Sequence, residues 1–273
     1  MPEGDTLAKA AARLRPALAG HVLTRWEAPR LRGDAPRVGS RIEAVEARGK
    51  HLLIHFDDDD GTGGPLSLRT HLRMSGSWHL YREGERWQKP AHLARAVVGA
   101  DSGWVAVCFS APVVETYRRT DDAEPAALAA LGPDLCVVDP ADESVLQTIL
   151  DRAQSIGATD PTVTIGEALL DQRIAAGIGN VYKSEACYVG RVAPGSRLAA
   201  VSEDLRRELW TTAARQLQAN LGHAERRTHP AGLAVYGRSG RPCYRCGTPV
   251  RMARQGEQAR SSYWCPTCQP ELS

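Results

Sequence analysis

Four of the seven cysteines in this 273-residue chain form two Cys-x2-Cys pairs separated by 18 residues. They are Cys243, Cys246, Cys265 and Cys268. Two pairs at this spacing are typical of a tetrahedral zinc site in which each pair lies at the tip of a β-hairpin. Because all four ligands would be protein sulfurs, the metal would have no open coordination position for catalysis. The sequence therefore predicts a C-terminal zinc ribbon in which Zn²⁺ is structural.

The other three cysteines, Cys108, Cys136 and Cys187, stand alone among apolar residues. An odd number of cysteines argues against a disulfide framework and predicts buried free thiols in addition to the metal site. The chain has no apolar run long enough to cross a bilayer and no signal-peptide pattern. We therefore expect a cytoplasmic protein, nucleoid-associated if bacterial, with no membrane partner. Nothing in the sequence indicates an obligate oligomer, so we expect a monomer.

Basic residues are concentrated toward the C-terminal end. The formal net charge is only +2, but residues 191–273 hold thirteen arginines, no lysine and six acidic residues. A local excess of arginine predicts a surface that binds phosphate. A hairpin in the predicted ribbon would place Arg254 or Arg260 against a nucleic-acid backbone. The alternative for either arginine is plain solvation.

Residues 22–117 read as short, often alternating segments separated by turn signals. Such a pattern predicts an antiparallel β-sandwich or barrel of seven or eight strands. The predicted strands are 22–26, 42–47, 51–56, 66–72, 77–81, 94–98 and 104–109. Before them, apolar residues recur at helical spacing from Leu7 to Leu18. We expect Thr6 to cap this helix and Gly20 to end it.

Helical patterns replace strand patterns after residue 118. The capping box Thr164-x-x-Glu167 predicts a helix that continues to about residue 176. A glycine-rich turn at 177–180 separates it from a further helix at 181–188, which is an arrangement of the helix-turn-helix type. The other predicted helices are 141–156 and a long one from Ser202, its cap, to about 221.

The turn at 177–180 reads Gly-Ile-Gly-Asn and ends in Asn180. Backbone N–H groups at a helix N-terminus bind anions, and glycines allow a phosphate to approach closely. The side-chain amide of Asn180 can also donate to a phosphate oxygen. The alternative is a tight interhelical turn in which Asn180 is only an N-cap. The two interpretations are compatible.

The chain begins Met1-Pro2-Glu3-Gly4-Asp5-Thr6. If Met1 is removed, Pro2 presents a secondary amine, and an α-amino group has a pKa near ~8 rather than the ~10.4 of lysine. Such an amine can attack a sugar C1′ or a carbonyl to form an iminium ion, which promotes elimination. Glu3 is a candidate acid/base beside it. The alternative is an exposed N-terminus with no chemical role.

Two further residues are candidates for work on a nucleic acid. Lys50 precedes the apolar segment 51–54 and is a candidate proton donor or phosphate ligand, although a lysine entering a strand is usually just exposed. Met74 lies in the turn 72–76 and offers a large, flexible apolar group that could wedge between bases. Its alternative role is core packing.

Four motifs together resemble the formamidopyrimidine-DNA glycosylase/endonuclease VIII family over essentially the whole chain. They are Pro2-Glu3-Gly4, Arg48-Gly49-Lys50-His51-Leu52-Leu53, Gly177-Ile178-Gly179-Asn180-Val181-Tyr182 and the four-cysteine ribbon. The resemblance implies an α+β fold with three domains. These are an N-terminal antiparallel β-sandwich (1–120), a helix-two-turn-helix domain (121–228) and a zinc ribbon (234–270), with damaged DNA bound in the cleft between the lobes.

The resemblance also implies a bifunctional DNA glycosylase and abasic-site lyase of base-excision repair. By position, Pro2 is the nucleophile that attacks C1′ as the damaged base leaves, and Glu3 is the acid/base that assists sugar ring opening. Lys50 is the proton donor linked to β-elimination. Asn180 grips the backbone near the lesion, and Arg260 contacts phosphate and is associated with δ-elimination. Met74 would fill the space left by the flipped nucleotide.

The sequence departs from the family pattern at two places, of which the first puts the role of a second acid in doubt and the second bears on the substrate. The family often has a second acid at the position of Thr6. Members specialised for oxidised purines have an Arg-x-Phe type loop, whereas residues 109–115 here read Phe-Ser-Ala-Pro-Val-Val-Glu, more like endonuclease VIII. We therefore expect oxidised pyrimidines and abasic sites as substrates. The alternatives are an oxidised-purine glycosylase and, from another class, a non-catalytic protein that binds damaged DNA.

Overall fold

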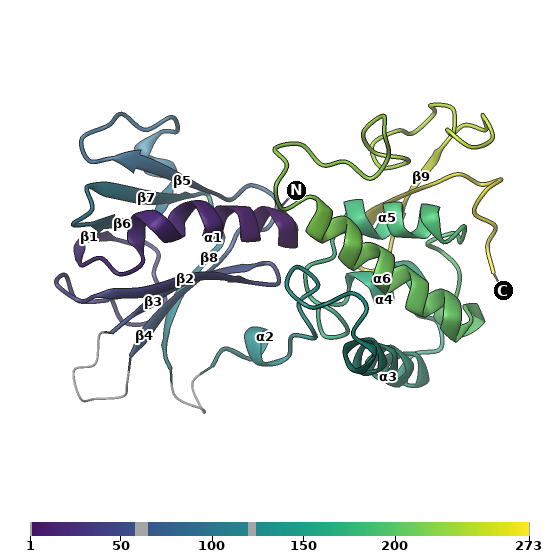
Figure 1. Ribbon diagram of the computed structural model, residues 1–273, viewed down its shortest axis with the longest axis horizontal. Coiled ribbons are helices and arrows are strands. Elements are labelled where there is room, and N and C mark those ends of the chain that lie inside the picture. The colour runs from purple at the N-terminus through teal and green to yellow at the C-terminus, as the bar shows by residue number, and fades with distance from the viewer. Residues whose placement is uncertain (1, 58–64, 120–123, 273) are drawn as a thin grey trace. The chain divides into compact units, whose positions relative to one another are not determined.

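The computed structural model describes residues 2–57, 65–119 and 124–272 (Figure 1). The chain forms two compact units, Met1–Ala129 and Ala130–Ser273, which we call unit 1 and unit 2. The predicted boundary at 120/121 lies outside the described ranges, and the three-domain division stays a prediction. Among the helices in the described ranges, none combines the length and the apolar character that a membrane span requires.

Unit 1 contains two four-stranded antiparallel sheets, which confirms the sandwich. The first sheet has the order β1 (Leu23–Glu27), β6 (Ala94–Ala100), β7 (Trp104–Phe109), β5 (Ser77–Arg82). The second has the order β2 (Ile42–Arg48), β3 (His51–Phe56), β4 (Leu66–His71), β8 (Val113–Arg118). Each of the seven predicted segments forms a strand, and β8 is the eighth. A short 3₁₀ helix, Ala91–Leu93, precedes β6.

The core of unit 1 follows from the alternation of side chains along the strands. Leu52, Ile54 and Phe56 of β3 belong to one apolar cluster with Ala96 and Val98 of β6. The helix α1 (Gly4–Leu18) joins this cluster through three fully or nearly fully buried leucines, Leu7, Leu14 and Leu18. Burial of each leucine contributes on the order of 1.5–3 kcal/mol. The packing fixes α1 against β2, with further contacts to β3, β6 and β7.

The start of α1 differs from the prediction. The helix begins at Gly4 with Glu3 as its N-cap, so Thr6 is the third helical residue and not the cap. The two residues form a reversed capping box, in which the Thr6 hydroxyl accepts the backbone N–H of Glu3 at 3.4 Å. The helix therefore starts directly after the residue pair Pro2-Glu3.

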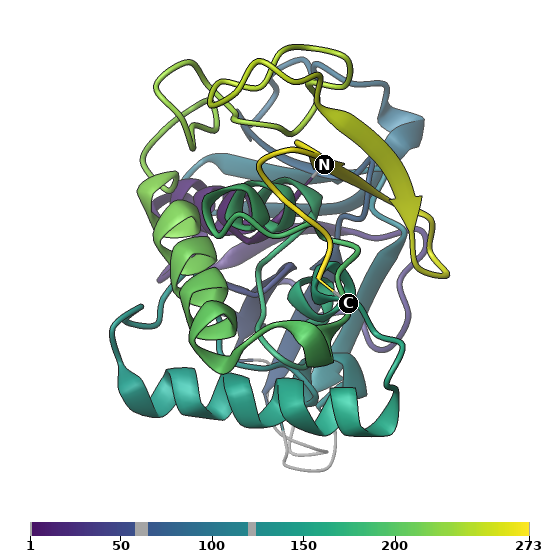
Figure 2. The same cartoon turned by 90° about the vertical axis from the view of Figure 1, so that its right-hand side faces the viewer.

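Unit 2 is helical apart from a C-terminal hairpin. Its helices are α3 (Glu143–Thr159), α4 (Ile165–Leu170), α5 (Asn180–Val189), α6 (Glu203–Ala219) and the short 3₁₀ helix Leu198–Ala200, and its strands are β9 (Arg251–Gln255) and β10 (Arg260–Trp264). Helix α6 contacts both α3 and α5. Figure 2 shows α3, in teal, on the opposite side of this unit from the yellow hairpin. The four-residue helix α2 (Ala126–Ala129) closes unit 1.

Helix α4 is shorter than predicted. The capping box of Thr164 and Glu167 is present, but the helix ends at Leu170 instead of near residue 176. The reason is a long-range pairing of Ala176, whose N–H donates to the carbonyl of Pro133 at 2.9 Å and whose carbonyl accepts from Leu135 at 3.1 Å. A continued helix would have used these groups internally, and they instead fix the approach to the 177–180 turn.

Candidate active site and metal centre

The N-terminal pair of unit 1 is held at the head of a packed helix. Glu3 is fully buried, and Pro2 before it is partly exposed. Asp5, in the first turn, is also fully buried, and it accepts a hydrogen bond from the Lys9 ammonium at 3.3 Å. The positive end of the helix dipole favours both carboxylates. An amine at Pro2 would therefore lie beside a buried acid whose backbone position is fixed by α1.

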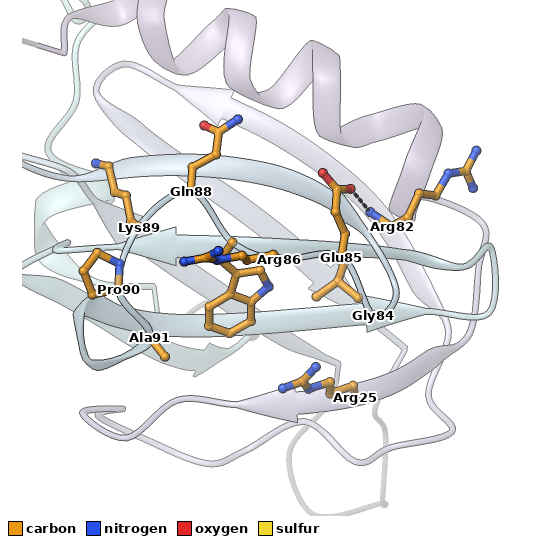
Figure 3. Close-up of a pocket in the computed structure, with 11 residues that line it drawn as sticks. Arg25, Arg82, Gly84, Glu85, Arg86, Gln88, Lys89, Pro90 and Ala91 are labelled. Carbon is orange, nitrogen blue, oxygen red and sulfur yellow. Dashed lines mark hydrogen bonds between the residues drawn. The ribbon is translucent and has the colours of Figure 1, made fainter.

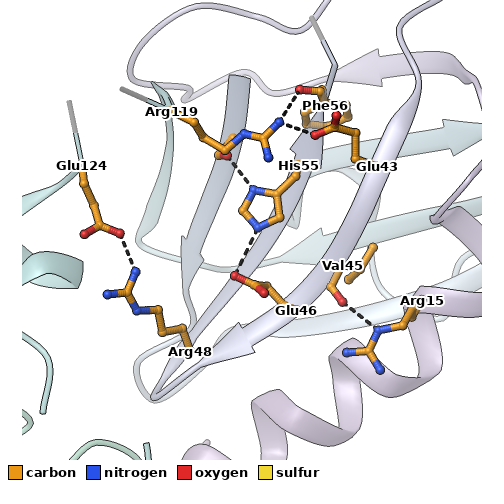
Figure 4. Close-up of polar contacts among 10 residues, drawn as sticks. Arg15, Glu43, Val45, Glu46, Arg48, His55, Phe56, Arg119 and Glu124 are labelled. Carbon is orange, nitrogen blue, oxygen red and sulfur yellow. Dashed lines mark hydrogen bonds and ion pairs between the residues drawn. The ribbon is translucent and has the colours of Figure 1, made fainter. Parts of the chain in front are cut away.

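Lys50 lies in a two-residue hairpin turn between β2 and β3. Arg48 and His51 pair across the strands, so the turn consists of Gly49 and Lys50. Gly49 has a φ of 59°, which suits glycine at the first position of such a turn. Arg48 anchors the turn: its guanidinium pairs with Glu124 (Figure 4) and also donates to the carbonyl of Leu128 at 3.4 Å. The backbone that carries Lys50 is therefore held at a defined place in unit 1.

A buried polar cluster follows Lys50 on the outer face of the second sheet. Arg69 pairs with Glu115, and its Nε donates to Nδ1 of His51 at 3.1 Å. The rings of His51 and His71 lie 4.8 Å apart. Burial, with smaller contributions from the positive charges of Arg69 and its neighbours, lowers the pKa of His51 to about 3. Because arginine can only donate, Nδ1 of His51 is the acceptor, and the neutral ring carries its proton on Nε2.

A second histidine lies on the same face, further along β3. His55 bonds Ser67 Oγ through Nδ1 at 2.7 Å, and its Nε2 lies 3.2 Å from a carboxylate oxygen of Glu46 (Figure 4). The hydrogen bond from His55 lowers the pKa of Glu46. The cross-strand register brings these groups together from separate strands. The sequence analysis did not predict this polar layer. The signal for it is the spacing of His51 and His55, because residues four apart on a strand lie on the same face.

Met74 projects from the turn between β4 and β5. It is 67% exposed, so the alternative of core packing is wrong. The turn before and after it is fixed, since Leu72 is buried and a Cβ at Gly76 would lie 2.7 Å from the carbonyl oxygen of Leu72. Arg73 has a left-handed φ of 46°. This turn therefore presents a large apolar side chain to solvent on a constrained backbone.

Asn180 is the first residue of α5 in unit 2. Its N-cap is Gly179, so the alternative of Asn180 as N-cap is wrong. Gly177 has a φ of 108°, which only glycine adopts readily. Asn180 is 6% exposed, and within the described ranges its side-chain Oδ1 is buried without a hydrogen-bond partner. A buried acceptor left unpaired costs about 1–3 kcal/mol, so Oδ1 is suited to a hydrogen-bond donor, whereas a phosphate oxygen would be bound by the NH2 group of the same amide.

The hairpin β9–β10 is attached to α5 by buried hydrogen bonds. The ammonium of Lys183 donates to the carbonyl of Ser261 at 3.0 Å, and the Tyr263 N–H donates to Ser184 Oγ at 3.3 Å. Lys183 is fully buried. The start of α5 and the start of β10 therefore form one connected element within unit 2.

Arg260 and Arg254 lie on this hairpin, and both are exposed. In the register of the strands, Arg260 pairs with Gln255 and Arg254 pairs with Ser261. Paired residues share a face and successive residues alternate. Arg260 is thus on the same face as Ser262, which contacts α5, and Arg254 is on the opposite face. The two arginines therefore lie on opposite faces of the hairpin and do not form one cluster.

The four cysteines of the predicted ribbon come together as a candidate metal site. Their sulfur atoms all lie within 4.8 Å of one another, with 3.5 Å between Cys246 and Cys265 and 4.0 Å between Cys243 and Cys268. A tetrahedral Zn²⁺ with Zn–S bonds of ~2.3 Å has sulfurs ~3.8 Å apart. The backbone N–H of Arg245 donates to the sulfur of Cys243 at 3.4 Å. The donor set and its spacing fit a tetrathiolate metal.

The three lone cysteines are buried, as expected. Burial raises the pKa of Cys187 to about 12 and raises that of Cys108 further. Neither thiol is nucleophilic at neutral pH. These two cysteines are therefore packing residues and not reactive thiols.

Comparison with known proteins places these features in a family. The model of the formamidopyrimidine-DNA glycosylase N-terminal domain matches residues 1–108. The chain is 43% identical, over 98% of its length and 94% of the relative, to a Streptomyces coelicolor protein named probable endonuclease 8 2. It is 35% identical, over 98% of its length and 99% of the relative, to the DNA-(apurinic or apyrimidinic site) lyase Nei2 of Mycolicibacterium smegmatis. The crystal structure of the MutM (Fpg) protein from Thermus thermophilus matches with a TM-score of 0.77 and 28% identity, covering 100% of both chains.

Proposed function

Because the chain belongs to the formamidopyrimidine-DNA glycosylase/endonuclease VIII family, we propose that it is a bifunctional DNA glycosylase and abasic-site lyase of base-excision repair. The observation that carries the proposal is the placement of Pro2-Glu3. A fully buried acid caps a helix that is packed into the sandwich core, and the candidate nucleophile directly precedes it. A protein that only binds DNA has no need of this arrangement together with an anchored Lys50.

In the proposed reaction, the nitrogen of Pro2 attacks C1′ of a flipped nucleotide, and the bond from C1′ to the damaged base breaks. Glu3 transfers the proton that opens the sugar ring. The resulting iminium ion acidifies the hydrogen on C2′, so that loss of this proton expels the 3′ phosphate. Lys50 supplies a proton in this elimination. Water then hydrolyses the iminium ion and regenerates Pro2.

The DNA-binding assignments use residues from both units. Met74 inserts where the nucleotide has left the helix. Asn180 donates to a backbone phosphate through its side-chain amide, supported by its place at the start of α5. Arg260 pairs with a second phosphate. Arg254, on the other face of the hairpin, is assigned a separate backbone contact.

We propose Zn²⁺ as the metal held by Cys243, Cys246, Cys265 and Cys268. Its chemistry is structural, because four thiolates complete a tetrahedral shell. The ribbon then orders the hairpin that carries Arg260. We further propose that the protein acts on nucleoid DNA as a monomer, which light scattering of the purified protein with and without DNA would test.

We propose oxidised pyrimidines as the preferred bases. The support is the segment 109–115, which lacks an Arg-x-Phe loop, together with the endonuclease 8 names of the relatives. Turnover of duplexes that contain thymine glycol should exceed turnover of duplexes that contain 8-oxoguanine. The reverse order would favour the oxidised-purine activity, which the structural match to MutM (Fpg) makes the second candidate.

Borohydride trapping tests the catalytic assignment. Protein with a native Pro2 terminus, mixed with an abasic duplex and reduced, should give a covalent adduct of protein and DNA, and Pro2→Gly should lose most of it. Mass spectrometry must first confirm that Met1 is absent, because an added residue blocks the amine. Tight binding with no adduct from correctly processed protein would favour the non-catalytic alternative.

A further inference from the structure

A second basic surface lies in unit 1, on the outer face of the sheet β1-β6-β7-β5. Two adjoining depressions share Arg25, Trp87 and Ala91 in their walls, and we call the pair the Trp87 groove. Arg82, Arg86 and Lys89 complete the cationic lining on one side of Trp87, and Arg30 and Arg95 do so on the other. Figure 3 shows Arg86 and Lys89 on the loop that crosses above the strand carrying Arg25.

The lining of this groove has an excess of positive charge. Residues 1–129 contain 18 Lys and Arg against 17 Asp and Glu. Six of the cations line the groove (Arg25, Arg30, Arg82, Arg86, Lys89 and Arg95) but only two of the acids, Glu27 and Glu85. The lining of the groove therefore has an excess of four cations, whereas residues 1–129 as a whole have an excess of one.

The two acids leave most of this charge available. Glu27 pairs with Arg25 at 2.7 Å. Glu85 accepts the backbone N–H of Arg82 at 2.9 Å, which is a bond to a neutral group. Arg30 and Arg86 are both exposed, one from each depression. These two guanidinium groups are placed to meet an anionic polymer on either side of Trp87.

Trp87 is a fixed aromatic platform between these cations. Its ring is stacked near Tyr81 at 6.4 Å and meets Phe109 edge-on at 5.8 Å, while the side chain as a whole stays partly exposed. Lys89 is also held, since its ammonium donates to Ser77 Oγ at 2.8 Å. A positively charged groove with an aromatic ring on which a base can stack is the arrangement that binds single-stranded nucleic acid.

We propose that the Trp87 groove is a second DNA-binding site, which takes a single-stranded segment with one base stacked on Trp87 and phosphates bound by Arg30 and Arg86. The choice of DNA as the polymer rests on the proposed function. A duplex could use the cations, but its bases are already stacked, so it would not use the indole. The contribution of Trp87 therefore distinguishes the single strand from a duplex, and direct binding of an oligonucleotide distinguishes it from an acidic protein.

The test measures binding of a fluorescein-labelled single-stranded thymidine 20-mer by anisotropy over a range of KCl concentrations. Full-length protein is used with an excess of unlabelled, undamaged short duplex, which competes for the proposed catalytic surface. The variants are Arg30→Glu/Arg86→Glu and Trp87→Leu, which keeps an apolar side chain over Tyr81 and Phe109. Arg41→Glu, an exposed arginine of unit 1 outside the groove, is the matched control.

The double charge reversal should weaken binding of the 20-mer at least tenfold. It should also flatten the slope of log K against log salt by about 1.4, because each phosphate contact to a single strand contributes about 0.7. Trp87→Leu should weaken binding at least fivefold, since stacking of one base is worth ~1–3 kcal/mol. Arg41→Glu should bind like the parent protein.

Unchanged binding by the double charge reversal overturns the proposal. A loss in that variant with none in Trp87→Leu also overturns the stacking of a base on Trp87 and favours a duplex occupant. Borohydride trapping of each variant on a short abasic duplex reports separately on the proposed function. Failure of trapping in the parent protein would remove the catalytic assignment and leave the groove measurement valid.

Discussion

The ammonium group of Lys183 on α5 lies 2.5 Å from the hydroxyl of Ser262 on β10, to which it donates a hydrogen bond. This fully buried lysine also donates to the carbonyl of Ser261. Asn180 lies three residues before it on α5, and Arg260 lies two residues before Ser262. A single side chain thus connects the two elements that carry the proposed phosphate ligands of unit 2.

Replacing Lys183 by Met should loosen the hairpin without emptying the metal site. The change leaves buried acceptors without their donor, which costs about 1–3 kcal/mol. We expect weaker binding of an abasic duplex, by at least fivefold, with metal content still one per chain. Ser184→Ala, which removes two hydrogen bonds between neutral groups, one to the Asn180 carbonyl and one from the Tyr263 N–H, is the milder control. Parent-like affinity in Lys183→Met would show that the connection is not needed for binding.

The stability of unit 1 should fall as the pH drops below about 6. The pKa of His51 is about 3 in the folded protein, against an ordinary value near 6.5. Between these values the unfolded chain binds a proton that folded His51 does not, so the free energy of unfolding decreases by up to ~1.4 kcal/mol per pH unit. The contribution is fully present above pH 6.5 and is lost progressively toward pH 3.

His51→Gln should flatten this dependence, because glutamine does not titrate. His79, whose pKa burial also lowers, contributes in the same direction in every variant. The exposed His92, changed to Gln, is the matched control and should keep the parent slope. The free energy of unfolding of unit 1 is measured by urea denaturation of the full-length protein at pH 4, 5, 6 and 7. An equal slope in His51→Gln and the parent would contradict a neutral, buried His51.

Met74→Ala should separate base excision from folding. The side chain is 67% exposed, so the free energy of unfolding should change by less than about 0.5 kcal/mol. Excision of thymine glycol from a duplex should fall at least tenfold, because the flipped state loses the group that fills its place. Cleavage of a single-stranded abasic oligonucleotide should stay within twofold. Val38→Ala, an exposed apolar residue of the same unit, should change neither rate.

Removing the metal should abolish binding of an abasic duplex and leave unit 1 folded. Cys243 and Cys265 belong to an apolar cluster with Tyr188, Val235 and Val250, so the metal site and the packing of the ribbon on α5 depend on each other. A chelator should remove one Zn²⁺ per chain and eliminate the affinity for an abasic duplex, and Zn²⁺ should restore it. Cys268→Ser should behave like chelated protein, whereas Cys136→Ser, at a lone buried cysteine, should retain metal. Retained affinity in metal-free protein would contradict a role for the ribbon.

Local patterns were enough to predict the strands and the ribbon. The short apolar run of β3 and the two Cys-x2-Cys pairs are signals carried by neighbouring residues, and tertiary contacts reinforce them. The cap of α1 was mispredicted because threonine is favoured at an N-cap and glutamate is not. Here their usual places are exchanged, with Glu3 at the cap and Thr6 at the third helical position.

The features that could not be predicted depend on long-range pairing. The early end of α4 follows from the bonds of Ala176 to Pro133 and Leu135, which lie about forty residues away in sequence. The contact of Arg69 with His51 requires the register of β3 and β4, and the Trp87 groove requires the segment 82–91 to share one depression with Arg25 of β1. The sequence offered the residue types at each place but not their partners.

The distribution of sulfur has a consequence for oxidative damage. Cys108 and Cys187 are sealed inside the two units and remain protonated, whereas Cys246 is exposed at the ribbon surface. Peroxide would therefore reach the ribbon thiols first, and a bound metal would shield them by withdrawing their reactive lone pairs. Oxidative stress also creates the proposed substrates, so the ribbon cysteines would be oxidised under the conditions in which the enzyme is needed. The supply of zinc would then determine how long the protein keeps its proposed DNA-binding activity.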